Sequence, residues 1–249
     1  MESQQMNLDV ISNNLANVNT TGYKESKLEF QDLLYQTTRA AGSQQGGGNQ
    51  LPGSLQIGQG SIPIATERVF TNGELSQTGG NLDVAIQGAG FFQVQMPDGT
   101  LAYTRDGGFK TDSEGRVVTS DGYPVQGGFQ PVPTGTTNIT ISASGAVTYT
   151  TSSGTTTSQI QLANFNNPGG LEALGHNLFK ETQASGSAQL GDPTQSGLGE
   201  LQQGYLELSN VSVVQEMVNL ILAQRAYEVN SKAVQAADQM MQDSNNLQR

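Results

Sequence analysis

Apolar residues recur at helical spacing near the N-terminus. Leu8, Ile11, Leu15 and Val18 follow one another at steps of three or four residues, the spacing of one face of an α-helix. The polar and glycine-containing run at residues 19–22 interrupts this pattern. We therefore expect an amphipathic helix over residues 1–18.

The C-terminal segment is predicted to be the longest helix. From about Glu207 to Leu247 it contains no glycine or proline, which gives a helix about 40 residues and 60 Å long. Two apolar stripes lie on opposite sides of it. One stripe contains Val211, Val218, Leu222, Val229, Ala233, Ala236, Met240 and Leu247, and the other contains Val213, Met217, Leu220, Tyr227, Val234 and Met241. The short N-terminal helix can cover only part of one stripe, so the remainder packs on a β domain or on other copies of the chain. Periodicity alone leaves both open.

Between the helices the pattern changes to short β-prone runs separated by turn signals. The turns are Pro97-Asp98-Gly99, Asp106-Gly107-Gly108, Ser113-Glu114-Gly115 and Asp121-Gly122, whose glycines are expected to supply the positive φ that tight hairpins require. We therefore expect a central, mostly antiparallel β domain over residues 67–191. With helices at both ends, the fold class is α+β.

The remaining boundaries follow from composition. Residues 1–39 contain the N-terminal helix and a following segment, in which the apolar spacing fits a helix or a strand. Residues 40–66 carry no charge and several glycines, and are predicted to be a linker or long loop. Residues 192–249 form a connector and the long helix. Within the β domain, residues 122–171 contain no Asp, Glu, Lys or Arg, which is typical of exposed strands that are prone to pair at their edges.

Charge and composition exclude several kinds of chemistry. Eleven basic and 22 acidic residues give a net charge of −11, and no basic cluster suits nucleic acid. The chain contains no cysteine, and a single histidine, His176, provides no pair of metal ligands. No apolar run approaches the roughly 20 residues of a membrane span, and Met1 begins no secretion signal. We expect no catalytic site, cofactor, metal or membrane insertion.

Two signatures at opposite ends resemble those of bacterial flagellar rod and hook proteins. The first is SNNLANVNTTGYK at residues 12–24, and the second comprises SNV at 209–211, EMV at 216–218 and AQRAYEVNSK at 223–232. Between them, the sequences ERVF at 67–70, LDVAI at 82–86, GFF at 90–92 and YTRDGGF at 103–109 are similar to the distal-rod branch of this family. The resemblance covers nearly the whole chain.

The resemblance implies a structural subunit of the flagellar basal body without enzymatic activity. It further implies that the terminal helices pair as a coiled coil around an export channel while the β domain faces outward. The subunits would form a helical tubular polymer, the distal rod, which carries motor torque to the hook. Implied partners are further copies, proximal rod and hook-side proteins, surrounding ring proteins and the flagellar export apparatus. The resemblance also implies export without a cleaved signal and a location in the rod that crosses the periplasm.

We expect the subunit interface to use apolar residues from three segments. They are Leu8, Ile11, Leu15 and Val18 of the first helix, Met217, Leu220, Tyr227, Val234 and Met241 of the last, and Leu51, Leu55 and Ile57 of the uncharged segment. Family members usually extend further ahead of Met1, so the N-terminal helix is expected to be shorter here.

The alternatives are a proximal rod or hook subunit of the same family and, from another class, an exported carbohydrate-binding β-module. The terminal signatures are shared across the family, whereas residues 51–60 and the following Arg68-Val69-Phe70 favour the distal rod. A carbohydrate-binding module would be a monomer with an aromatic-lined groove.

Overall fold

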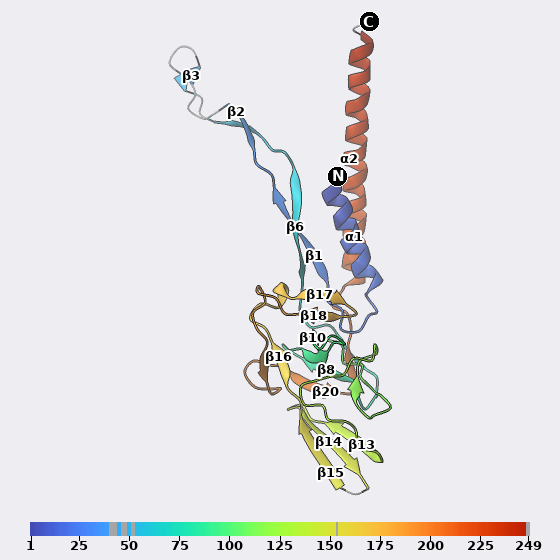
Figure 1. The fold of residues 1–249 in the computed structure, drawn as a ribbon. Coiled ribbons are helices and arrows are strands. Elements are labelled where there is room, and N and C mark those ends of the chain that lie inside the picture. The colour runs from blue at the N-terminus through green and yellow to red at the C-terminus, as the bar shows by residue number, and fades with distance from the viewer. Residues whose placement is uncertain (40–43, 46–48, 51–52, 153, 248–249) are drawn as a thin grey trace. The chain divides into compact units, whose positions relative to one another are not determined.

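The structure is a computed structural model that describes residues 1–39, 44–45, 49–50, 53–152 and 154–247 (Figure 1). Its contacts divide the chain into two units, each assembled from segments far apart in the sequence. Unit 1 comprises residues 1–13, 26–67 and 217–249, and unit 2 comprises residues 14–25 and 68–216.

Two helices form the ends of the chain. Helix α1 spans Glu2–Ala16 and helix α2 spans Val213–Leu247, with 15 and 35 residues respectively. The two helices are in contact, and the buried Asn14 amide donates a hydrogen bond to the Glu216 carboxylate at 3.4 Å. The predicted association of the terminal helices is therefore confirmed. The predicted start of the long helix near Glu207 was wrong, because Tyr205–Glu207 instead forms strand β21, paired with β7 (Leu75–Gln77).

The β strands of unit 1 form a two-stranded ribbon. Strand β1 (Ser26–Asp32) pairs with β6 (Ser61–Arg68), β2 (Gln36–Arg39) with β5 (Leu55–Ile57), and β3 (Gln44–Gln45) with β4 (Asn49–Gln50). The segment whose spacing fitted a helix or a strand is thus strand β1. Part of the predicted linker at residues 40–66 is also strand, since β-branched Ile57, Ile62 and Ile64 favour extended backbone.

Unit 2 contains the predicted antiparallel β domain. A four-stranded sheet has the order β17-β18-β10-β9, a three-stranded sheet has the order β13-β14-β15, and two-stranded sheets join β11 to β12, β16 to β19, β20 to β8 and β21 to β7. These pairings are antiparallel.

The further bounds in unit 2 are β8 (Val84–Gln87), β9 (Phe92–Gln95), β10 (Leu101–Thr104), β11 (Lys110–Thr111), β12 (Val117–Val118), β13 (Thr136–Ile141), β14 (Ala146–Thr151), β15 (Gly154–Gln159), β16 (Leu162–Asn164), β17 (Glu172–Gly175), β18 (Leu178–Lys180), β19 (Gln189–Gly191) and β20 (Glu200–Gln203), with a 3₁₀ turn at Pro168–Gly170.

The core of unit 2 contains two apolar clusters. The larger includes Val84, Ile86, Phe92, Tyr149 and Leu162, and the smaller is aromatic, with Phe91, Tyr103, Phe165 and Phe179. Rings of the aromatic cluster meet edge to face, for example Tyr103 and Phe165 at 4.8 Å between centroids. Strands β8, β9 and β10 are buried on both faces, with three consecutive buried residues each, so they contribute side chains to clusters on either side.

The turn glycines have two different roles. Gly99, Gly115 and Gly122 adopt the expected positive φ of +81°, +78° and +86°. Gly107 does not have positive φ, which corrects the prediction for the Asp106-Gly107-Gly108 turn. A Cβ atom on Gly107 would collide with the Val84 carbonyl oxygen, so close approach of the backbones requires this glycine.

Candidate functional site

Three buried charged side chains meet inside unit 2. Lys24 follows α1, Arg105 follows β10, and Glu207 is the last residue of β21, shortly before α2. The Lys24 Nζ lies 2.6 Å from Glu207 Oε1, and the Arg105 Nε lies 3.1 Å from Glu207 Oε2. The side chains of Lys24 and Glu207 have no exposed surface, and that of Arg105 is 3% exposed. One carboxylate therefore holds two buried cations from distant parts of the sequence.

Backbone groups complete the surroundings of Lys24 and Glu207. The Lys24 ammonium also donates to the Thr71 carbonyl oxygen at 2.7 Å, and the Gly73 N–H donates to Glu207 Oε1 at 2.9 Å. Lys24 precedes the β domain in the sequence and Glu207 lies near its end. These two hydrogen bonds therefore connect the loop at residues 71–73 to both segments. Such bonds offset part of the cost of taking these charges out of water.

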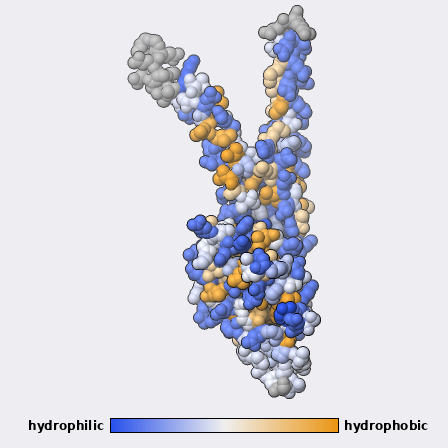
Figure 2. All heavy atoms as spheres, viewed as in Figure 1, coloured by the Kyte–Doolittle hydropathy of each residue, from blue (hydrophilic) through white to orange (hydrophobic). Residues whose placement is uncertain are grey.

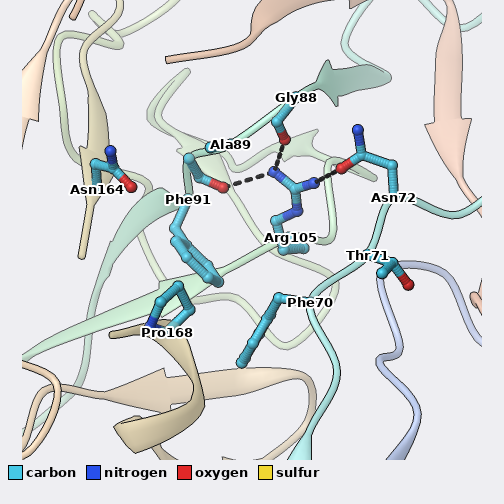
Figure 3. Close-up of a pocket in the computed structure, with 10 residues that line it drawn as sticks. Phe70, Thr71, Asn72, Gly88, Ala89, Phe91, Arg105, Asn164 and Pro168 are labelled. Carbon is cyan, nitrogen blue, oxygen red and sulfur yellow. Dashed lines mark hydrogen bonds between the residues drawn. The ribbon is translucent and has the colours of Figure 1, made fainter. Parts of the chain in front are cut away.

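The two terminal nitrogens of the Arg105 guanidinium donate hydrogen bonds within the protein. Nη1 donates to the carbonyl oxygens of Gly88 and Gly90 at 2.9 and 2.7 Å, and Nη2 donates to Asn72 Oδ1 at 2.8 Å and to Glu207 Oε1 at 3.4 Å (Figure 3). The four N–H groups on Nη1 and Nη2 are thereby occupied, and Nε lies buried 3.1 Å from Glu207 Oε2. Arg105 is thus a structural cation rather than an anion-binding group.

A pocket of about 350 Å³ lies beside this guanidinium. Its walls include Phe70, Phe91 and Pro168, which face one another in Figure 3, and Asn164 and Asn72 also line it. The lining offers apolar surface and amides but no nucleophile with an adjacent base. Its chemistry suits packing, not catalysis.

Burial sets the charge balance of the cluster. Desolvation lowers the pKa of Lys24, the nearby Arg105 lowers it further, and Glu207 opposes both effects. Desolvation also lowers the pKa of Arg105, again against Glu207. Two cations share one carboxylate, so the stability of the cluster depends on Glu207.

The N-terminal signature contributes further buried polar contacts. The Tyr23 hydroxyl donates to Asn14 Oδ1 at 3.1 Å. The Asn210 side chain of the C-terminal signature accepts from the Glu25 N–H at 2.8 Å and donates to the Val69 carbonyl oxygen at 2.8 Å. Both signatures therefore fasten the segments next to the helices to the β domain.

Sequence reasoning assigned no role to Lys24, Arg105 or Glu207. Lys24 and Arg105 were noted only within motifs, and Glu207 only as the expected start of a helix. The identity of a charged residue in a short motif does not indicate whether its side chain is buried in the folded protein. The one available clue is that Lys24, Arg105 and Glu207 stand in a chain with few charged residues, 13% of the total.

The predicted interface residues of α2 are mostly accessible. Met217, Val234 and Met241 are 50%, 50% and 63% exposed, Tyr227 is 38% exposed, and Leu220 is partly buried. Figure 2 shows apolar surface along the helix and along the ribbon of unit 1. These side chains are available for contacts with other chains.

The other predicted residues differ in exposure. On and just after α1, Ile11 is buried, whereas Leu8, Leu15 and Val18 are partly buried. On the ribbon, Leu55 and Ile57 are 54% and 57% exposed. Leu51 lies outside the described residues.

Among the described residues, no group of three or more His, Cys, Asp and Glu side chains could hold a metal ion. His176 lies in a turn with φ of +52°, beside Asn177, whose side chain donates to the Thr21 carbonyl oxygen at 2.8 Å. Over the same residues, neither helix is long and apolar enough to span a membrane.

The buried carboxyl group of Asp106 is expected to make the stability of the protein depend on pH. Desolvation raises the pKa of its carboxyl group, and Asp83 and Asp121 raise it further, against a hydrogen bond from the Gly108 N–H. The folded state therefore binds more protons than the unfolded state just above the ordinary pKa of 3.8, and stability falls as the pH rises through the folded pKa. We expect Asp106→Asn to stabilise the protein at pH 7, and this gain to disappear as the pH falls below 3.8. Urea unfolding of both proteins over this pH range measures the difference.

Asp98 is the matched control, because hydrogen bonds from the Thr100 hydroxyl and N–H lower the pKa of its carboxyl group. Asp98→Asn should show the opposite sign, a loss at pH 7 that disappears in acid. A pH-independent difference between Asp106→Asn and the unmodified protein would contradict the assignment.

Three family descriptions match the chain: "Flagella basal body rod protein" over residues 1–24, "Flagellar hook protein FlgE/F/G D1 domain" over 85–149 and "Flagellar basal body rod FlgEFG protein C-terminal" over 202–247. Each of these segments contributes one member of the buried cluster, Lys24, Arg105 and Glu207 respectively.

Three similar proteins are flagellar basal-body rod proteins named FlgG. The protein from Caulobacter vibrioides is 50% identical over 99% of this chain and 95% of its own length. That from Buchnera aphidicola subsp. Acyrthosiphon pisum is 48% identical over 99% of this chain and 96% of its own length. That from Bacillus subtilis is 40% identical over 100% of this chain and 96% of its own length.

Proposed function

The chain belongs to the FlgG family of flagellar basal-body rod proteins and is a structural subunit of the distal rod, and we propose that its copies polymerise through α2 and the ribbon of unit 1. The polymer is a helical tube that carries torque to the hook and encloses the export channel. Membership in a structural, non-enzymatic family sets aside the carbohydrate-binding module, and similarity to FlgG along the chain sets aside the proximal rod and hook subunits.

The exposed apolar surface of α2 is the observation that carries this proposal. At 1.5 Å per residue, α2 is about 52 Å long and α1 about 22 Å. Helix α1 can therefore cover less than half of α2, while Val234 and Met241 near the far end remain 50% and 63% exposed. Assembly would bury this surface at a gain of about 25 cal/mol per Å². The predicted interface residues Met217, Leu220 and Tyr227 belong to the same stripe.

The ribbon of unit 1 supplies a second contact. A two-stranded ribbon has marginal stability alone, and this one exposes large apolar residues: Phe30, Leu34, Tyr35, Leu55, Ile57, Ile62 and Ile64. Leu34 is 88% exposed. The ribbon packs against adjacent subunits, which keeps them from sliding and makes the polymer straight and stiff. The exposed side chains of Leu55 and Ile57 take part in this contact.

The finer partners and the route of the subunit follow from the same family. The rod meets proximal rod proteins at one end and hook-side proteins at the other, within surrounding ring proteins. The subunit passes through the flagellar export apparatus without a cleaved signal and reaches the part of the rod that crosses the periplasm. These statements rest on membership in the family.

A substitution on β5 tests the ribbon contact. In the double variant Leu55→Ser and Ile57→Ser, two exposed apolar side chains are lost without removing a ladder hydrogen bond. We expect an unchanged monomer that forms fewer or curved polymers, because the contact contributes about 0.8 kcal/mol for each buried methylene group. Electron microscopy gives the curvature, and amide exchange of residues 55–66 in monomer and polymer gives the ordering.

Gln56→Ser is the control on the same strand, since its side chain points to the opposite face. Straight, abundant polymers of the double variant, together with equal exchange in the monomer and the polymer, would reduce the ribbon to an idle linker. Failure of the unmodified chain to polymerise would contradict the proposed function itself.

A further inference from the structure

The three-stranded sheet β13–β14–β15 has one covered edge. The Gln203 side chain, on β20, accepts a hydrogen bond from the Ile141 N–H at 2.9 Å and donates to the Ile139 carbonyl oxygen at 2.8 Å. Its amide therefore occupies the outer edge of β13 much as the backbone of a further strand would. The edge at β13 is not free to accept another chain along residues 139–141.

The opposite edge, at β15, pairs with no further strand of the described residues (Figure 1), although Gly128 closely approaches the Gln159 carbonyl oxygen at the C-terminal end of this edge. Strand β15 pairs with β14 in continuous register, from Ala146 opposite Gln159 to Thr151 opposite Gly154. The next pair includes the Ile160 N–H, which donates to the Gly145 carbonyl oxygen at 2.8 Å. Because bonded residues alternate in an antiparallel strand, Thr155 and Thr157 direct their backbone groups outward on the part of this edge that Gly128 does not reach.

None of the residues that the structure describes forms a backbone hydrogen bond to these outward groups. Four of the six residues of β15 are threonine or serine, which suit an extended backbone.

The devices that normally protect an edge strand are missing from β15. Soluble proteins place lysine, proline or a bulge on such edges to prevent pairing with other chains. Strand β15 has none of these, and it lies within residues 122–171, which contain no charged side chain. The whole chain carries a net charge of −11, so two copies repel each other in general. An uncharged edge is a place where a second copy can approach without that repulsion.

We propose that β15 accepts an extended segment of a second copy of this chain, which adds a strand to the sheet across the subunit boundary. The inference rests on the proposed self-assembly and adds a contact made by the β domain to those made by α2 and the ribbon. Backbone hydrogen bonds are directional, so this contact fixes the orientation of one β domain against the next. The incoming segment is not the neighbour's own β15, because two such edges would close a two-fold dimer instead of continuing a polymer.

Amide exchange tests the proposal on the unmodified full chain. In the monomer, the N–H groups of Thr155 and Thr157 should exchange rapidly, whereas that of Thr156, directed toward β14, is already protected. In the polymer we expect exchange at Thr155 and Thr157 to slow by about tenfold or more. Polymers in which these two amides exchange as fast as in the monomer would overturn the strand addition while leaving the proposed self-assembly intact.

Two substitutions at one position provide a second test. Thr157→Pro removes the outward N–H and no bond to β14, a position at which an edge strand tolerates proline. Thr157→Val keeps that N–H and nearly the same side-chain shape. We expect the proline variant to need about fivefold or more protein to polymerise, and the valine variant to match the unmodified chain.

The monomeric proline variant must first show the unmodified unfolding transition. If it does not, Thr157→Lys replaces it, since a charge at this edge opposes pairing without altering the backbone. A folded proline or lysine variant that polymerises like the unmodified chain overturns the proposal. If the unmodified chain does not polymerise, both this proposal and the proposed function fail.

Discussion

Replacing Glu207 by glutamine is expected to lower the free energy of unfolding by about 3–5 kcal/mol, the usual cost of removing one partner from a buried ion pair. The amide has nearly the same shape but carries no charge. The ammonium of Lys24 and the guanidinium of Arg105 would then face each other in a site with almost no exposed surface. Urea unfolding followed by far-ultraviolet circular dichroism measures the loss.

A matched control separates burial from charge. Glu114→Gln removes a carboxylate that pairs with Arg116 at 3.4 Å on the exposed surface, and it should leave the unfolding midpoint unchanged. Adding Lys24→Met to Glu207→Gln should recover part of the loss, because one of the two unbalanced cations is then gone. Equal effects of Glu207→Gln and Glu114→Gln would show that the cluster is solvated.

Substituting the second apolar stripe of α2 is expected to abolish polymerisation. The triple variant Leu220→Ser, Tyr227→Ser and Val234→Ser removes the residues spaced by seven along the helix. Each large apolar side chain that assembly buries fully contributes about 1.5–3 kcal/mol. We expect no polymer at about a hundredfold the concentration that suffices for the unmodified chain. Sedimentation and electron microscopy measure this, and thermal melting of the β domain should remain unchanged.

The flank of α2 offers a control of the same size. Glu228, Lys232 and Gln239 are exposed and lie roughly 100° to 140° around the helix from the centre of the stripe, so changing all three to serine should leave assembly intact. If the stripe variant melts earlier as well as failing to polymerise, the stripe belongs to the core of the monomer. Loss of polymer in both triple variants would point to weakened helix formation.

Local pattern was enough to predict the elements that depend on local chemistry. The periodicity of Leu8, Ile11 and Leu15 predicted α1, and the Asp-Gly turns predicted hairpins at Gly99 and Gly122. Contacts between distant residues were not predictable in this way. Tyr205–Glu207 fits a helix by composition, but pairing with Leu75–Gln77 makes it a strand.

The candidate site was harder to predict than the fold. The exposure of apolar residues on α2 could be predicted, because this helix has more apolar positions than the short N-terminal helix can cover. The buried cluster of Lys24, Arg105 and Glu207 depends instead on depth, which arises only when three segments fold together. The ribbon was missed in part because glycine and the absence of charge in residues 40–66 suggest a loop, whereas its strands form by pairing with residues 26–39.

The first and last strands of unit 2 are neighbours: β7 pairs with β21, and β8 pairs with β20. Lys24, near the N-terminus, likewise forms its ion pair with Glu207, near the end of unit 2. A chain that emerges from the ribosome one residue at a time therefore holds β8 without its partner until residue 200 has appeared. Early segments cannot lock into their final arrangement, because loop closure over more than a hundred residues must come first. The pairings of β7 and β8 and the ion pair of Lys24 are therefore completed only late in synthesis, after the hairpins between them have been made.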